Sequence, residues 1–234
     1  MLRSKRMRCA AIILAGMPLQ SRADIIMNAN HQAGSALLSQ MCIYGYAASA
    51  VEIVKLMNIK NVAPIFAAMV LSDGINNAIF ILKVMGPEVT VNILQEILAL
   101  KQHGAAVEIF VKMDSEMMRN MLLFIKKAQE TQGNPAKILE IFNLLSQKNA
   151  INVFKIMLKF EGGGNQFTAE ILATTMNQER AMEVLVALSI KSATKIIKFM
   201  HADESYKAWV LKIAPSLKQC DKGEKILNAA KIKV

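Results

Sequence analysis

The chain carries the sequence Ile53-Val54-Lys55-Leu56-Met57 and, 12 residues further on, Ile65-Phe66-Ala67-Ala68-Met69. In both stretches two adjacent apolar residues are followed by two residues of any type and then by methionine. Apolar residues with this spacing share one side of a helix, so each stretch predicts the buried end of a short helix. Further copies end at Met17, Met41, Met85, Met113, Met157 and Met200.

The spacing of the copies predicts a repeat. When other apolar residues are allowed at the methionine position, copies end at residues 29, 41, 57, 69, 85, 97, 113 and 125, so the steps alternate between 12 and 16 residues. Two short helices would therefore recur with a period of about 28 residues. Later copies end at 145, 157, 176, 188 and 200, and the longer steps of 20 and 19 residues contain loop signals at residues 131–135 and 161–165.

Polar turns follow these copies and predict the start of the next helix. Asp114, Ser146 and Asp203 stand where a side chain can accept a hydrogen bond from the free N–H groups of a first helical turn. Pro87 stands where a first helical turn tolerates proline. Since the sequence has no alternating β-forming run of useful length, it predicts an all-α protein.

Short helices are marginally stable alone, because nucleation is costly and each has an apolar face to bury. Stacking of neighbours buries those faces continuously. We therefore expect a superhelical stack (an α-solenoid) over residues 10–213, a basic N-terminal extension at 1–9 and a basic C-terminal helix or tail at 214–234. The methionines are expected to fill its core, with an exposed Met-lined peptide groove as the alternative.

Three stretches share a longer order: an anchor, a polar turn, an alanine and then a pair of apolar residues. They are Met57–Phe66, Met17–Ile26 and Met176–Leu185. This pattern resembles the helical N-terminal domain of MgtE-type magnesium transporters and the helical repeats of the flagellar motor switch protein FliG. The resemblance implies a right-handed superhelical stack used for regulation or protein contact. Asp114 and Glu116 form the only close acidic pair within residues 9–190, and we expect them to cap a helix and face solvent.

The net charge of +10 lies at the two ends of the chain. Residues 1–8 contain four basic residues and no acid, and residues 191–234 contain ten lysines and four acids, whereas residues 9–190 contain fourteen of each. Basic ends of this kind attract nucleic acid or anionic lipid, or simply keep the termini solvated. The candidate contacts for nucleic acid or another anion are Lys218, Lys222, Lys225, Lys231 and Lys233.

The sequence offers no catalytic or metal-binding motif. Its three cysteines and three histidines are dispersed without a CxxC or related spacing, which fits a reducing, cytoplasmic location. Gly162-Gly163-Gly164 lacks the Gly-Lys-Ser/Thr of a phosphate-binding loop. We therefore expect no enzyme activity, cofactor or metal. The basic residues before the apolar stretch 9–15 also resemble a short targeting signal, so export or organellar import stays open.

The length of the apolar stretches, about eight residues, argues against a membrane span, which needs about 20. The leading hypothesis is a protein-interaction scaffold that docks a helix or peptide of another protein. A nucleic-acid-binding repeat protein that uses its basic ends is the first alternative. A regulatory module linked to magnesium transport is the second.

Overall fold

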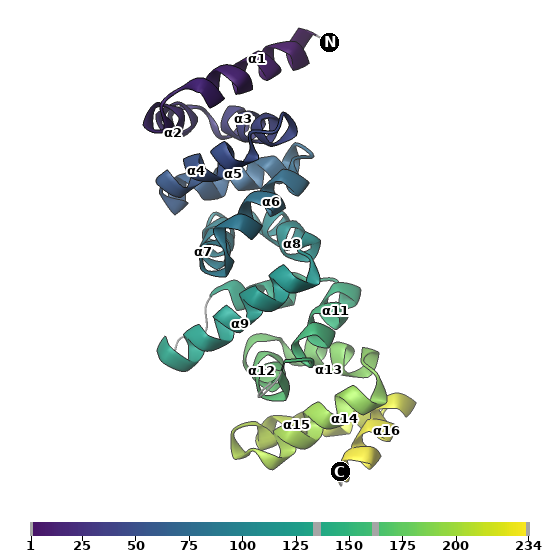
Figure 1. Ribbon diagram of the computed structural model, residues 1–234. Coiled ribbons are helices and arrows are strands. Elements are labelled where there is room, and N and C mark those ends of the chain that lie inside the picture. Colours follow the sequence, from purple (N-terminus) through teal and green to yellow (C-terminus); the bar gives the residue numbers. More distant parts are fainter. Residues whose placement is uncertain (1, 133–136, 161–163, 233–234) are drawn as a thin grey trace. The chain divides into compact units, whose positions relative to one another are not determined.

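A computed structural model describes residues 2–132, 137–160 and 164–232, and these ranges are all-helical, as predicted. The chain forms two compact units, Met1–Ile138 and Leu139–Val234, called here the first and second unit. Figure 1 shows the helices of each. None of the helices in the described ranges is long and apolar enough to cross a lipid bilayer.

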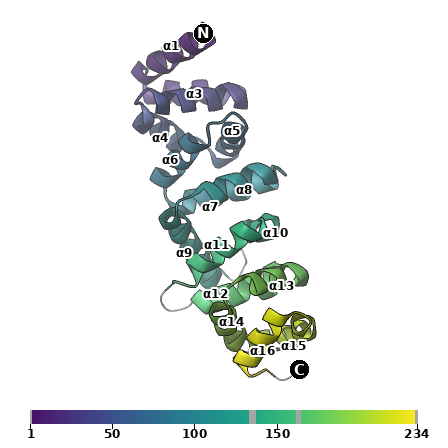
Figure 2. The ribbon, with the colours of Figure 1, turned by 90° about the vertical axis from the view of Figure 1, so that its right-hand side faces the viewer.

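The first unit is built from helices that pack on their second neighbours. Its helices are α1 (Leu2–Gly16), α2 (Leu19–Asn28), α3 (His31–Ile43), α4 (Ala47–Leu56), α5 (Ile59–Leu71), α6 (Ile75–Met85), α7 (Pro87–Ala99), α8 (His103–Lys112) and α9 (Ser115–Gln132). Contacts link α1 to α3, α3 to α5, α5 to α7 and α7 to α9, and likewise α2 to α4, α4 to α6 and α6 to α8. Figure 2 shows the successive helices α1, α3 and α5 from the side.

The second unit follows the same arrangement. Its elements are α10 (Ile141–Leu144), α11 (Gln147–Met157), α12 (Gly164–Glu170), the π-helical turn η2 (Ile171–Thr175), α13 (Gln178–Ala187), α14 (Ile190–Ala202), α15 (Glu204–Lys218) and α16 (Asp221–Ala230). A 3₁₀ turn, η1 (Lys137–Glu140), precedes α10. Here α11 packs on α13 and α13 on α15, while α12 packs on α14 and α14 on α16.

The helices begin where the polar turns predict. Asp114 Oδ1 accepts a hydrogen bond from the Met117 N–H at 2.8 Å, and Asp203 Oδ1 accepts one from the Ser205 N–H at 2.9 Å. Ser146 caps α11 in the same way. Gly86, at φ 89°, makes the turn into α7, and Pro87 is the first residue of that helix. The predicted helix starts are thus confirmed at these turns.

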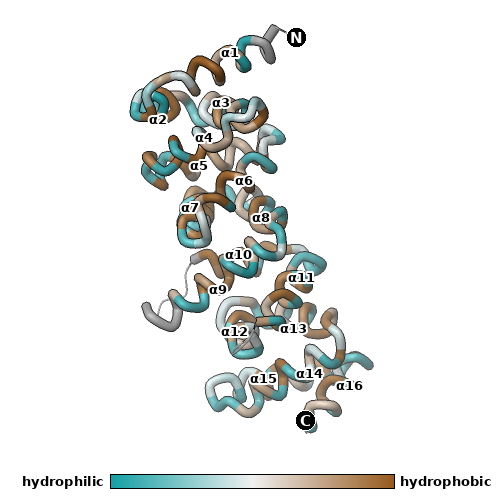
Figure 3. Tube along the Cα trace, in the orientation of Figure 1, coloured by the Kyte–Doolittle hydropathy of each residue, from teal (hydrophilic) through white to brown (hydrophobic). Residues whose placement is uncertain are grey.

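The repeated methionines lie mainly in the interior. Met41, Met69, Met157 and Met200 are fully buried, whereas Met17 and Met85 are half-buried. Most helices carry both hydrophobic and hydrophilic residues, which leaves one face for the core and one for solvent (Figure 3). The expected core role is therefore confirmed for the buried methionines.

Some predicted boundaries differ from the observed helices. The copy that ends at Ile125 predicts a helix end, but α9 continues to Gln132. The basic residues at the N-terminus belong to α1, which begins at Leu2 and continues through the first apolar copy. The loop signals at 131–135 and 161–165 fall largely on residues 133–136 and 161–163, which lie outside the described residues.

Candidate functional site

The lysines predicted as anion contacts lie at the end of the second unit. Lys218 is in the last turn of α15, Lys222 and Lys225 are in α16, and Lys231 follows α16 with a left-handed φ of 61°. Lys233 lies outside the described residues. The first turn of α16 also carries two acids, Asp221 and Glu224. Positive and negative charges therefore alternate on this helix, and these lysines do not line one of the pockets described below.

A stronger concentration of positive charge lies elsewhere in the second unit. Helices α11 and α14 carry no acidic residue, and with the turn after α11 they present six exposed lysines. We call this set the lysine surface: Lys148, Lys155, Lys159, Lys191, Lys195 and Lys198. In the described part of the chain, none of the six is engaged in an ion pair.

Three members of the lysine surface surround a pocket of about 360 Å³ between α11, α12 and α14. We call it the lysine pocket, and its lining residues are Lys155, Leu158, Lys159, Asn165, Ser192 and Lys195. The Ser189 hydroxyl donates a hydrogen bond to Ser192 Oγ at 2.9 Å. The pocket thus combines three cationic groups with two neutral polar side chains.

The amphipathic pattern of α14 explains why its lysines point outward. Ile196, Ile197 and Met200 are fully buried, and the three lysines of this helix recur at i, i+4 and i+7, which is one helix face. This signal is present in the sequence: no acid occurs between Glu183 and Asp203. The charge count over residues 191–234 conceals this acid-free stretch, because it includes the acid-bearing helices that follow α14.

A groove whose described lining is uncharged lies in the first unit between α1 and α3. Its volume is about 560 Å³, and its lining residues are Met7, Asn30, Gln32, Ala33, Ala36, Leu37 and Gln40. Four of these follow one face of α3 at i, i+3, i+4 and i+7: Ala33, Ala36, Leu37 and Gln40. We call this feature the α3 groove. Its lining combines small and apolar residues with side-chain amides, which can bond to a peptide backbone.

Asp114, of the acidic pair Asp114 and Glu116, is engaged by protein partners. Asp114 caps α9 and also accepts a hydrogen bond from Lys83 Nζ at 2.7 Å. The hydrogen bond from Lys83 and that from the Met117 N–H lower the pKa of the Asp114 carboxyl below its ordinary 3.8. Among the described residues, no group of three or more His, Cys, Asp or Glu side chains is arranged to hold a metal ion.

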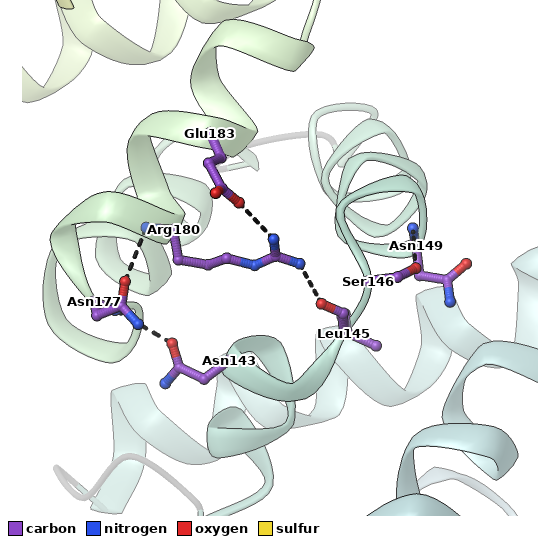
Figure 4. A network of polar contacts seen from close by, with 7 residues as sticks. All are labelled: Asn143, Leu145, Ser146, Asn149, Asn177, Arg180 and Glu183. Atoms are coloured by element: carbon purple, nitrogen blue, oxygen red, sulfur yellow. Dashed lines mark hydrogen bonds and ion pairs between the residues drawn. The ribbon is translucent and has the colours of Figure 1, made fainter.

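A polar network ties α10 to α13 (Figure 4). The Arg180 guanidinium donates hydrogen bonds to the Leu145 carbonyl oxygen and to Glu183 Oε2, the second at 2.6 Å. Asn143 Nδ2 donates to the Thr175 carbonyl at 2.7 Å, and its Oδ1 accepts from the Asn177 N–H at 3.2 Å. These hydrogen bonds join α10 to η2 and α13.

The cysteines differ in their surroundings. Cys9 is exposed, Cys42 and Cys220 are half-buried, and all three are free thiols. Burial raises the pKa of the Cys42 thiol to about 11, which suppresses the reactive thiolate. Comparisons of the chain with protein-family models, with curated proteins and with solved structures found no match.

Proposed function

We propose that this protein is a non-catalytic helical-repeat scaffold, an α-solenoid of two-helix repeats that docks a helix or peptide of a partner protein. The observation that carries the proposal is the packing of each helix on its second neighbour along the first unit. Helices α2 to α9 begin at residues 19, 31, 47, 59, 75, 87, 103 and 115, so their starts alternate in steps of 12 and 16. Stacked repeats of this kind offer extended surfaces for binding.

The repeat can be tested by removing one unit of it. Deletion of residues 59–86 removes α5 and α6, a full 28-residue period, and joins Asn58 to Pro87. Asn is a favourable N-cap and Pro a favourable first helical residue, so the new junction is compatible with a helix start. We expect a folded, cooperatively melting protein. Deletion of α5 alone, residues 59–72, would move every later helix from one series of second-neighbour contacts to the other. This deletion should abolish the cooperative transition. Equal behaviour of both deletions would refute the repeat.

The α3 groove is the proposed docking site on this scaffold. An amphipathic helix can lay its apolar side along Ala33, Ala36 and Leu37, because the two alanines permit close approach. The amides of Gln32 and Gln40 match the polar groups of a peptide, as does the Asn30 Nδ2 group, whereas Asn30 Oδ1 already caps α3. The described lining carries no charged side chain, which favours an uncharged or weakly charged segment over a polyanion.

A matched pair of variants tests this assignment. Leu37→Glu places a charge in the groove, whereas Leu71→Glu places the same charge at a residue that is 83% exposed and outside the groove. Both should retain the helical circular dichroism of the wild type, and Gln40→Glu provides a milder groove variant. Proteins captured from nuclease-treated lysate by the wild type and Leu71→Glu, but lost from both groove variants, would support docking here. Equal capture by all variants, or no retained protein on the wild type, would refute it.

A further inference from the structure

The lysine surface of the second unit has a charge distribution that the scaffold does not explain. Solenoid stability needs only the inward faces of α11 and α14, yet their outward faces gather cations with no acid on either helix. Like charges so arranged repel one another, which costs stability unless an anion is bound. We infer that the lysine surface binds the phosphate backbone of a single-stranded nucleic acid.

The size of the charged region favours a chain of phosphates over a single phosphate group. Lys155, Lys159 and Lys195 meet at the lysine pocket, and the remaining members continue along the same helices. Lys148 is two turns from Lys155 on α11, or about 10 Å at 1.5 Å per residue. Lys191 and Lys198 span a similar length of α14. One phosphate would contact only the pocket, whereas a backbone would reach the lysines beyond it.

The chemistry of the pocket indicates a contact that does not read sequence. Lysine ammonium groups act as point charges toward phosphate, and Asn165 and Ser192 add neutral hydrogen-bonding groups. Among the described residues of the lining there is no aromatic side chain on which a base could stack. Binding should therefore be mainly electrostatic and strongly dependent on salt.

The concave shape of the pocket favours a single strand. Its three lysines come from α11, the turn after it and α14, and they surround a depression rather than a ridge. A flexible strand can bend a phosphate into such a depression. A duplex is stiff, with a persistence length of about 150 base pairs, and would touch only the outer lysines.

The test measures fluorescence anisotropy of a labelled 20-nucleotide oligouridylate with the full chain between about 50 and 200 mM KCl. Single-strand binding changes as the salt concentration to the power of about −0.7 per phosphate neutralised. We expect a slope of log affinity against log salt between about −2, for three pocket lysines, and about −4, for all six. The triple variant Lys155→Gln, Lys159→Gln, Lys195→Gln should bind at least about tenfold more weakly and flatten the slope by about 2.

The control removes the same charge from the same unit. Lys218→Gln, Lys222→Gln, Lys225→Gln takes three lysines from α15 and α16, where acids are interspersed, and should leave the slope nearly unchanged. All the substituted lysines are exposed or half-buried, so the control variant should melt like the wild type and the pocket variant, which loses like-charge repulsion, at the same temperature or higher.

Several results would overturn the inference. The first is no anisotropy change at 50 mM KCl, and the second is an equal loss of binding in the two triple variants. Tighter binding of a 20-base-pair duplex would exclude the preference for a single strand. Tighter binding of a labelled peptide with three phosphoserines, lost in the pocket variant, would assign the surface to a phosphoprotein instead.

Discussion

Gly223 gives the sharpest test of the packing in the second unit, because two effects of Gly223→Ala oppose each other. The residue lies inside α16, where alanine is favoured over glycine by about 0.5–1 kcal/mol. A Cβ at this position would, however, overlap the Leu217 carbonyl oxygen and lie 2.8 Å from its carbon and 3.0 Å from Cys220 Sγ. The first effect predicts a more stable protein and the second a less stable one.

The packing effect should dominate. Overfilling a close-packed site costs about 1–3 kcal/mol, and this site belongs near the upper end because a backbone carbonyl cannot change rotamer. Subtracting the gain in helix propensity leaves a net loss of about 2 kcal/mol in the free energy of unfolding. With a denaturant dependence of about 2 kcal/mol per molar urea, the unfolding midpoint should fall by about 1 M.

The assay can follow the second unit by itself. Trp209 is the single tryptophan and lies in α15, so its fluorescence reports unfolding of that unit, while far-ultraviolet circular dichroism reports both. Gly104→Ala is the matched control: Gly104 lies in the first turn of α8, and a Cβ there meets nothing within 4 Å. It should leave the Trp209 transition in place and raise the circular dichroism midpoint of the first unit slightly.

The outcome decides between the two effects. A Trp209 midpoint that is unchanged or raised in Gly223→Ala would show that α15 and α16 do not approach as closely as described. Lowered stability in Gly104→Ala as well would show that alanine is harmful for a reason other than the contact with Leu217.

Three further outcomes are expected. Arg180→Met should lower the free energy of unfolding of the second unit by about 1–3 kcal/mol, because the Leu145 carbonyl loses a charged donor. Glu183→Gln removes only an exposed ion pair and should cost less than about 1 kcal/mol. Trp209 fluorescence can follow both transitions, and equal losses in the two variants would contradict this. Asp114→Asn retains the cap but weakens the bond to Lys83. Since the pKa of Asp114 is lowered in the folded protein, its contribution to stability is complete above pH 3.8 and is lost as the pH falls further. The difference between the urea midpoints of wild type and variant should therefore vanish at low pH. A difference that grows at low pH would refute this prediction. The thiol pKa of Cys42 is about 11, against an ordinary 9.0, so Cys42 should react with iodoacetamide at pH 8 about 100-fold more slowly than an ordinary thiol. Peptide mass spectrometry after timed quenching measures this rate. Alkylation at the ordinary rate would contradict the burial of Cys42.

The helices and their starts were predictable because they depend on neighbours in the sequence. Asp114, Ser146 and Asp203 cap the helices that follow them, and the apolar residues spaced for one helix face are largely buried. The extension of α9 beyond Ile125 was not predictable from the repeat, because the pattern marks where apolar residues are buried and not where backbone hydrogen bonds stop.

The features of the candidate sites likewise divide into those that the sequence predicts and those that depend on the tertiary structure. The sequence by itself determined the all-α class, the capping residues and the excess of lysine, since composition and local spacing are sufficient for these. Only the tertiary structure decided which lysines share a pocket: Lys155 and Lys195 are 40 residues apart and meet because α11 and α14 both pack around α12. It likewise decided that Gly223 has no room for a Cβ whereas Gly104 has. Both properties depend on the distance between helices, and that distance is set by the packing of side chains remote in the sequence.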